Sequence, residues 1–426
     1  MATASPPPRP SRPFDVVMWG ATGFTGKIVA ERMLLTYGAG RSLRWALGGR
    51  SREKLEKVRA DLRAVDPAAG ELPILLGDSR DRASLDALAA SARVVASTVG
   101  PFAVHGRELV AACVDAATDY CDLTGEAHFV RDMIDAHHAR AQATGARIVH
   151  ACGYDSIPSD LGTLMVQGHM REKHGARCAE VKCFASLKGG FSGGTVASML
   201  NMVEEASRDR GVRRVLANPY SLDPDRTERG PDARDQLGVR WDADAGRWTG
   251  PFVMAPFNAR VVRRTNALLD YAYGRDFRYS EAMGFGAGPG GLLTAAAVTG
   301  AIAGAFAVAT VAPLRRLLEK TLLPAPGEGP SKEERDAGFF ASRFVGTARP
   351  EGGAAPVRVL GTVKGASDPG YGETAKMLSE SAVCLALDGD AISRRGGVLT
   401  PAACMGMRLV ERLRAAGMTF ETSEAS

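Results

Sequence analysis

Residues 16–26 constrain the fold of this chain more than any other stretch. An apolar segment, residues 16–19, runs directly into Gly20, Gly23 and Gly26, and an apolar pattern of helical period follows. Glycines at this spacing allow a tight turn after a strand, close approach of the backbone to a pyrophosphate, and close packing of the next helix. The free N–H groups at the start of that helix favour bound phosphate. The pattern predicts a dinucleotide-binding turn in a Rossmann-type α/β fold with a doubly wound parallel sheet.

The end of the next apolar segment indicates which dinucleotide binds. Residues 43–47 are predicted to form a strand, and Gly48, Gly49, Arg50 and Ser51 follow it. An NAD site usually has a carboxylate at this place to accept hydrogen bonds from the ribose 2′-OH. Here Arg50 can instead donate two hydrogen bonds to a phosphate, and Ser51 can donate another. The sequence therefore favours NADP(H), and the alternative is an exposed basic helix start without a ligand.

Further strands are predicted at 73–76, 93–99, 120–122 and 146–150, alternating with helical segments. Ligands bind at the carboxyl ends of the strands in such sheets, so the residues that follow these strands are expected to face the cofactor. The predicted cofactor-binding residues are Gly20, Ala21, Thr22, Gly23, Phe24, Thr25, Gly26, Arg50, Ser51, Asp78, Thr98, Val99 and Gly100.

A polar loop at 153–160 follows the predicted strand 146–150 and is the place where a substrate would meet the nicotinamide. Tyr154 or Asp155 could supply a proton there, and Ser156 could hold a carbonyl oxygen. These three are the predicted catalytic residues. The alternative is that Asp155 and Ser156 cap the following helix, and the two roles can coexist. His150 is either a general acid or a satisfied core histidine.

Composition excludes several other classes of function. A net charge of +5 over 426 residues is too small to indicate nucleic-acid binding. The seven cysteines are scattered without a C-x-x-C pair. They are expected to be buried in a reducing compartment. Asp119, Asp122 and Glu126 lack spaced histidine partners, so no metal is predicted. The G-x-S-x-G around Ser192 resembles a hydrolase elbow, but every histidine precedes it, so a loop is the better interpretation.

One segment complicates the picture of a simple globular enzyme. Residues 282–314 contain no charged side chain, and the part at 292–312 is long enough for a bilayer. Alanine, glycine and threonine dominate it, which weakens the drive for insertion. Three interpretations stay open: a buried or oligomer-interface helix, a membrane-associated helix or hairpin, and a disordered linker.

Several motifs together resemble the saccharopine dehydrogenase-like oxidoreductases, and the most similar branch is that of the trans-acting enoyl reductases. The matching segments are 20–26, 48–51, 98–102, 120–126, 153–160, 368–374 and 396–401. Residues 1–13 are rich in proline, serine and arginine and are predicted to form a disordered tail. The resemblance implies that an NADP-binding Rossmann domain at 14–160 is completed by about 372–426, and that 161–371 form an α+β substrate or dimerisation domain. It departs at Tyr154, where phenylalanine is usual in the family, and this weakens Tyr154 as the family's proton donor.

The resemblance also implies a function, namely NADPH-dependent reduction of an enoyl C=C bond in a lipid or polyketide-type acyl substrate during glycolipid assembly. It further implies a cytoplasmic enzyme at the cytoplasmic face of the plasma membrane, with contact through 292–312. A homodimer is a further expectation. The alternatives are a saccharopine-type amino-acid dehydrogenase, which needs cationic clamps that the motifs do not offer, and a membrane-associated nucleotide-binding scaffold without turnover.

Overall fold

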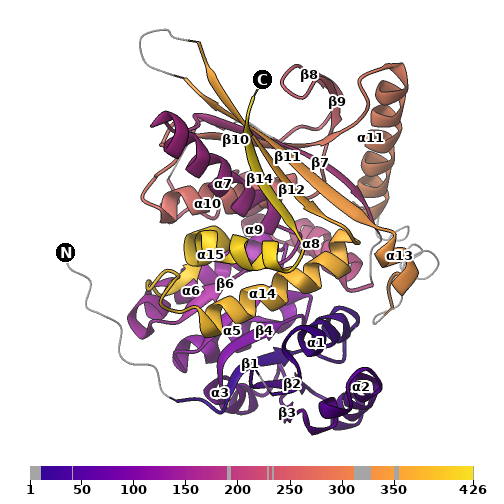
Figure 1. Ribbon diagram of the computed structural model, residues 1–426, viewed down its shortest axis with the longest axis vertical. Helices are drawn as coiled ribbons and strands as arrows, with labels where there is room; N and C mark the ends of the chain where they lie inside the picture. Colours follow the sequence, from indigo (N-terminus) through magenta and orange to yellow (C-terminus); the bar gives the residue numbers. More distant parts are fainter. Residues whose placement is uncertain are drawn as a thin grey trace. The chain divides into compact units, whose positions relative to one another are not determined.

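The structure of this chain is a computed structural model that describes residues 11–40, 42–189, 193–227, 230–232, 235–310, 328–349 and 355–425. The chain divides into two compact units (Figure 1). Unit 1 comprises Met1–Tyr154, Pro326–Gly329 and Gly370–Ala416, and unit 2 comprises Asp155–Ala325, Pro330–Pro369 and Gly417–Ser426.

Unit 1 is built on a parallel sheet. Within the described residues it has seven strands in the order β13-β6-β5-β4-β1-β2-β3, and every neighbouring pair is parallel. The strands are β1 (Phe14–Trp19), β2 (Trp45–Gly49), β3 (Ile74–Leu76), β4 (Ala92–Ser97), β5 (Asp119–Asp122), β6 (Arg147–Val149) and β13 (Gly397–Leu399). The chain winds outward from β1 in both directions, so a switch point lies between β1 and β4. This confirms the predicted Rossmann-type doubly wound sheet.

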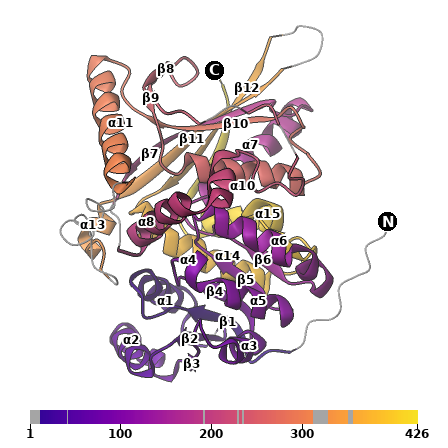
Figure 2. The ribbon, with the colours of Figure 1, turned by 180° about the vertical axis from the view of Figure 1, so that it is seen from behind.

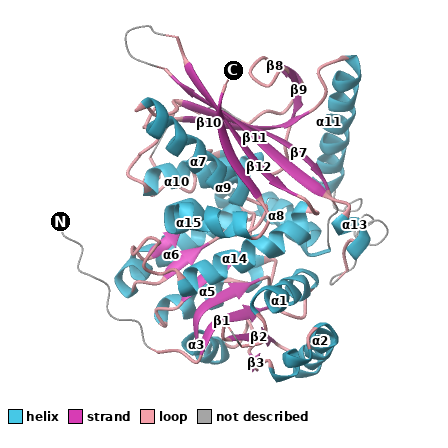
Figure 3. Cartoon of the chain, viewed as in Figure 1, coloured by secondary structure: helices cyan, strands magenta, loops and turns pink. Residues whose placement is uncertain are grey.

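Helices join and cover these strands, as the cartoon shows (Figure 3). They are α1 (Phe24–Tyr37), α2 (Arg52–Val65), η1 (Pro67–Glu71), α3 (Arg82–Ser91), α4 (Phe102–His105), α5 (Arg107–Asp115), α6 (Ala127–Thr144), α14 (Thr374–Leu387) and α15 (Pro401–Ala415). Val29 and Met33 lie on the buried face of α1, and Gly38 caps the C-terminal end of this helix with φ +70°.

The C-terminal part of the chain returns to unit 1. Strand β13 pairs with β6, and α14 packs against α1. The Tyr37 hydroxyl of α1 donates a hydrogen bond of 2.7 Å to Glu380 on α14. Glu380 also accepts one of 3.2 Å from Arg412 on α15. This buried carboxylate thus ties the three helices together.

Unit 2 contains a mixed sheet. Its described strands run in the order β14-β12-β11-β7-β10-β9-β8, with β7 and β10 parallel and the other pairs antiparallel. They are β7 (Glu180–Lys188), β8 (Arg240–Asp242), β9 (Arg247–Gly250), β10 (Arg278–Gly284), β11 (Phe339–Ala348), β12 (Val357–Gly365) and β14 (Thr419–Glu424). The helical elements are α7 (Ile157–His174), α8 (Gly193–Arg208), α9 (Arg210–Ala217), α10 (Ala255–Leu268), α11 (Pro289–Thr310) and α13 (Lys332–Asp336). The short element η2 (Pro369–Glu373) begins at the last residue of this segment of unit 2, and its other residues belong to unit 1.

The structure differs from the expected organisation at two places. Residues 417–426 belong to unit 2, where β14 pairs with β12, although the sequence placed them in the nucleotide domain. Unit 2 begins at Asp155, so residues 155–160 also lie outside the nucleotide-binding unit to which the sequence assigned them. The first ten residues of the expected tail and Ser192 lie outside the described residues.

Candidate cofactor and catalytic site

The turn between β1 and α1 leaves no room for side chains at its glycines. Gly20 has φ +91°, and a Cβ there would lie 2.6 Å from Cγ2 of Val99. A Cβ on Gly26 would lie 2.0 Å from the carbonyl oxygen of Gly20. Gly23 is the N-cap of α1. Because glycine has no side chain that could cap the helix, the first N–H groups of α1 can bind an anion. The turn therefore fits the pyrophosphate of a dinucleotide.

The loop after β4 lies against this turn. The Thr98 hydroxyl donates to the carbonyl oxygen of Gly20 at 3.3 Å, and the Thr98 N–H donates to that of Trp19 at 3.0 Å. The Phe24 ring is partly buried and meets the Tyr371 ring edge-on at 5.0 Å. Of the predicted set, Thr98 and Val99 thus border the glycine turn, and Phe24 has only its backbone to offer a phosphate.

The residues after β2 and β3 lie at the same edge of the sheet. The Ser51 side chain caps α2 by accepting from the Lys54 N–H at 3.3 Å, and its own O–H stays available to donate to a phosphate. The Asp78 carboxylate accepts from the Arg80 N–H at 2.9 Å, so it fixes the turn after β3. The contact of Asp78 with adenine stays a prediction.

The predicted catalytic loop begins beside the C-terminal return. The Tyr154 N–H donates to the Thr374 hydroxyl at 3.0 Å, and the side chains of Tyr154 and Asp155 are partly buried. Their roles as proton donors stay predictions.

Ser156 is fully buried, and its hydroxyl is already engaged. It donates to Oδ1 of Asn258 on α10 at 3.1 Å, and it makes no side-chain bond to the start of α7. Ser156 thus occupies the N-cap position of α7, as the helix-cap interpretation expects, but its side chain does not cap the helix because its partner lies on α10. The hydroxyl would have to leave Asn258 before it could hold a substrate oxygen.

A buried glutamate that the sequence did not single out completes this network. Glu281 on β10 accepts from the Asn258 amide at 2.9 Å and from the Ser159 hydroxyl at 2.6 Å. Burial raises the pKa of the Glu281 carboxyl above its ordinary value. No local motif surrounds this residue, and only the packing of α7, α10 and β10 brings the network together.

His150 forms a buried pair with Asp122. Its Nδ1 lies 2.8 Å from Oδ2 of Asp122, which also accepts from the Tyr120 hydroxyl at 3.0 Å. Within the described part of the chain, Nε2 of His150 has no hydrogen-bond partner. The Glu126 carboxylate accepts from two N–H groups at the start of α4, at 2.9 and 2.8 Å. Glu126 is thus a buried helix cap, and no acidic and histidine cluster suited to a metal occurs among the described residues.

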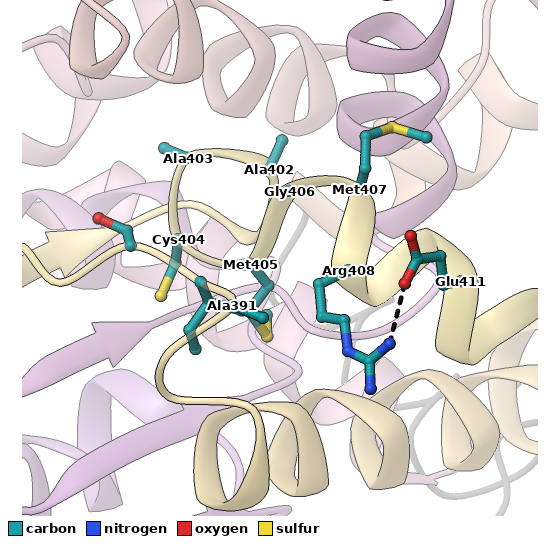
Figure 4. A pocket seen from close by; sticks show the side chains of 11 residues that line it. Ala391, Ala402, Ala403, Cys404, Met405, Gly406, Met407, Arg408 and Glu411 are labelled. Atoms are coloured by element: carbon teal, nitrogen blue, oxygen red, sulfur yellow. Dashed lines mark hydrogen bonds and ion pairs between the residues drawn. The ribbon is translucent and has the colours of Figure 1, made fainter.

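A cavity of about 450 Å³ lies elsewhere in unit 1, where Gly406 interrupts α15 with φ +54° (Figure 4). Alanine, methionine and cysteine side chains line it together with Arg408, which pairs with Glu411 at 2.9 Å. None of the predicted cofactor or catalytic residues lines this cavity.

Comparison with known proteins agrees with this geometry. A family model described as the saccharopine dehydrogenase NADP binding domain matches residues 16–149. A Mycobacterium tuberculosis protein named as a candidate trans-acting enoyl reductase is 45% identical over 423 residues, which cover 97% of this chain and 98% of that protein. The trans-acting enoyl reductase of Mycobacterium leprae is 40% identical over 430 residues, with 97% and 99% covered.

A solved structure shares the fold. Apo saccharopine dehydrogenase (L-Glu forming) from Saccharomyces cerevisiae has a TM-score of 0.53 and 11% sequence identity, with 96% of this chain and 99% of that chain covered.

Proposed function

We propose that this chain, which belongs to the trans-acting enoyl reductase family of saccharopine dehydrogenase-like oxidoreductases, reduces an enoyl C=C bond in a lipid or polyketide-type acyl substrate. It is an NADP(H)-dependent oxidoreductase that acts on a small molecule. The main support is the cradle at Gly20 and Gly26, where the backbone occupies the space that a side chain would need.

In this reaction, the residues of the chain would bind the cofactor and transfer a proton. NADPH supplies a hydride when bound. The N–H groups at the start of α1 bind its pyrophosphate, and Arg50 and Ser51 bind its 2′-phosphate. Tyr154 or Asp155 delivers the proton to the substrate carbon.

An amino-acid dehydrogenase is a weaker candidate because it needs cations that face substrate carboxylates. The buried arginines of α10 are engaged within unit 2. Arg260 donates to the carbonyl oxygen of Asn218 at 3.1 Å, and Arg263 pairs with Asp232 at 2.6 Å.

The test is an NADPH-oxidation screen over enoyl, keto and imine acyl substrates, with a parallel titration of NADPH and NADH by intrinsic fluorescence. Turnover of an enoyl substrate with NADPH is expected. NADPH oxidation with imine substrates alone would favour the amino-acid dehydrogenase, and tight NADPH binding without any turnover would favour the scaffold.

The proton donor is tested by two conservative variants. If Asp155 supplies the proton, Asp155→Asn lowers kcat by about 10²- to 10⁴-fold, while Tyr154→Phe keeps it. The reverse result assigns the role to Tyr154. NADPH affinity is expected to stay unchanged in both variants, and an unchanged kcat in both would remove this loop from the chemistry.

We propose further that α11 associates with a membrane. Among the described residues it is the one helix long and apolar enough to cross a bilayer, with a mean hydropathy of 1.8 over Pro289–Val308. Only 6% of its most apolar stretch is buried within this chain, so burial inside the chain is excluded, whereas the oligomer-interface interpretation stays open. Both ribbon views place α11 at the edge of unit 2, where it contacts β9 and α8 (Figure 1, Figure 2). Residues 311 and 312 of the expected span lie outside the described residues.

Vesicle co-sedimentation tests this placement. Leu293, which is 71% exposed, is replaced by lysine, and the matched control is Leu237→Lys, which changes an 81% exposed leucine elsewhere in unit 2. We expect Leu293→Lys to lower the bound fraction on phosphatidylglycerol vesicles several-fold, because it replaces exposed apolar surface near the start of α11 with a charge. If wild type does not bind vesicles but sediments as a dimer in ultracentrifugation, and Leu293→Lys sediments as a monomer, α11 is instead a homodimer interface.

A further inference from the structure

Three cationic or titratable side chains follow neighbouring strands of unit 1. Arg50 follows β2, Arg80 follows β3, and His105 ends the short helix α4 that follows β4. The strands β4, β1, β2 and β3 are adjacent and parallel, so their carboxyl ends meet at one edge of the sheet. The glycine turn after β1 lies at the same edge. These three residues therefore lie at the sheet edge where the adenosine end of a dinucleotide is expected.

Among the described residues, none of the three forms an ion pair or a side-chain hydrogen bond. Arg50 and Arg80 are exposed, and His105 is partly buried. Many other arginines of unit 1 are paired. Arg44 contacts Asp15 at 2.9 Å, and Arg82 contacts Asp115 at 2.6 Å. Unpaired guanidinium groups that gather at one sheet edge indicate a site for an anion.

The three groups also act on one another electrostatically. Burial lowers the pKa of His105, the positive charges of Arg80 and Arg50 lower it further, and the Asp78 carboxylate opposes them. Two other charged groups beside α4 are engaged: Arg107 pairs with Asp132 at 2.6 Å, and Glu126 accepts a hydrogen bond from the start of α4. An anion bound here would offset the excess positive charge.

We propose that Arg80 and His105 join Arg50 in binding the 2′-phosphate of NADPH, and that His105 makes this affinity rise as the pH falls from 8 to 6.5. This inference rests on the proposed function, because it takes NADPH as the cofactor. The two guanidinium groups suit a phosphate monoester, which accepts paired N–H bonds. A neutral imidazole at pH 8 takes up a proton when the phosphate dianion lies beside it.

The direction of the pH effect follows from linkage. In the free protein the pKa of His105 lies below its ordinary value, and a nearby dianion raises it. Between these two values, binding takes up a proton, so affinity increases as pH falls through the pKa of the complex. The phosphate itself begins to protonate near pH 6, so the window for the test ends at about 6.5.

Calorimetric titration with two fragments tests the cluster without turnover. The probes are 2′,5′-ADP, which carries the 2′-phosphate, and 5′-ADP, which lacks it. We expect Arg80→Ala to weaken binding of 2′,5′-ADP about tenfold or more and to change that of 5′-ADP less than about twofold. Wild-type affinity for 2′,5′-ADP should increase about threefold to tenfold from pH 8 to 6.5, and His105→Gln should remove this increase.

Two variants of the same residue types serve as controls. Arg63→Ala removes an exposed arginine near the far end of α2, and His137→Gln removes a partly buried histidine in the middle of α6. Both should keep the wild-type affinities and the wild-type pH dependence. Thermal melting checks that each variant is folded, and Arg80→Lys should restore part of the lost affinity.

The outcomes separate this inference from the proposed function. If wild type prefers 2′,5′-ADP but neither Arg80→Ala nor His105→Gln changes that preference, the cluster is wrong and the cofactor assignment stands. Equal weakening of both probes by Arg80→Ala also overturns the role in phosphate binding. If wild type binds neither NADPH nor 2′,5′-ADP, the proposed function fails together with this inference.

Discussion

Replacing Gly26 by alanine is expected to abolish detectable NADPH binding. The added Cβ would lie 2.0 Å from the carbonyl oxygen and 2.8 Å from the carbonyl carbon of Gly20. Both atoms belong to the backbone, so α1 must move away from the turn and its first N–H groups leave their positions. We expect an affinity loss of more than about 100-fold and a stability loss of about 1–3 kcal/mol from overpacking. Fluorescence titration with NADPH and thermal melting measure the two effects.

Gly23→Ala separates binding from folding. Gly23 has φ −75° and its Cβ would lie 3.4 Å from the nearest heavy atom, so alanine fits the free protein. Its methyl group would still occupy the space through which a pyrophosphate approaches the turn. This variant should therefore melt like wild type and bind NADPH much more weakly.

Gly168→Ala is the control for both glycine variants. It lies on α7 with no heavy atom within 4 Å of its Cβ. It should leave NADPH binding unchanged and stabilise the helix by up to about 1 kcal/mol. Wild-type NADPH affinity in both Gly23→Ala and Gly26→Ala would show that this turn is not the pyrophosphate site.

The nucleotide-binding half of the fold was predictable because its determinants are local. Strands β1 to β4 are short, mainly apolar runs that end in or before glycine or polar residues, as at Trp19 and Gly20. The stretch after Lys188 was not predictable in the same way, since a run of glycines gives no preference between strand and helix. Pairing of β14 with β12 joins residues about 60 positions apart, from Lys364 with Thr419 to Val359 with Glu424. No local pattern reveals such a pairing.

The same distinction applies to the site. The spacing of the glycines predicts a phosphate-binding turn from the sequence. The hydrogen-bond partner of Ser156, in contrast, lies 102 residues away on α10, so no local pattern predicts it. Arg80 and His105 each follow a strand without a recognisable motif, and only the order of the strands brings them to the edge that Arg50 occupies. Backbone chemistry was thus predictable from the residue types, but side-chain networks required the tertiary structure.

Removing the Asp119 carboxylate is expected to destabilise unit 1 by about 3–5 kcal/mol, because it leaves an arginine buried without its counter-charge. Asp119 on β5 is fully buried and accepts from the N–H of Arg147 at 2.8 Å and from Nε of Arg147 at 2.9 Å. Arg147 on β6 also donates to the carbonyl oxygen of Leu385 on α14 at 3.0 Å. The pair therefore joins two strands to the C-terminal return. Urea denaturation of Asp119→Ala measures the loss.

Two comparisons decide whether burial is the cause. Asp115 also contacts arginines, Arg82 at 2.6 Å and Arg140 at 2.8 Å, but its side chain is 35% exposed. Asp115→Ala should therefore cost less than about 1 kcal/mol. The double variant Asp119→Leu with Arg147→Met should be more stable than the single variant Asp119→Leu, because the double variant also removes the uncompensated positive charge. A cost for Asp119→Ala as small as that for Asp115→Ala would mean that the C-terminal return does not depend on this pair.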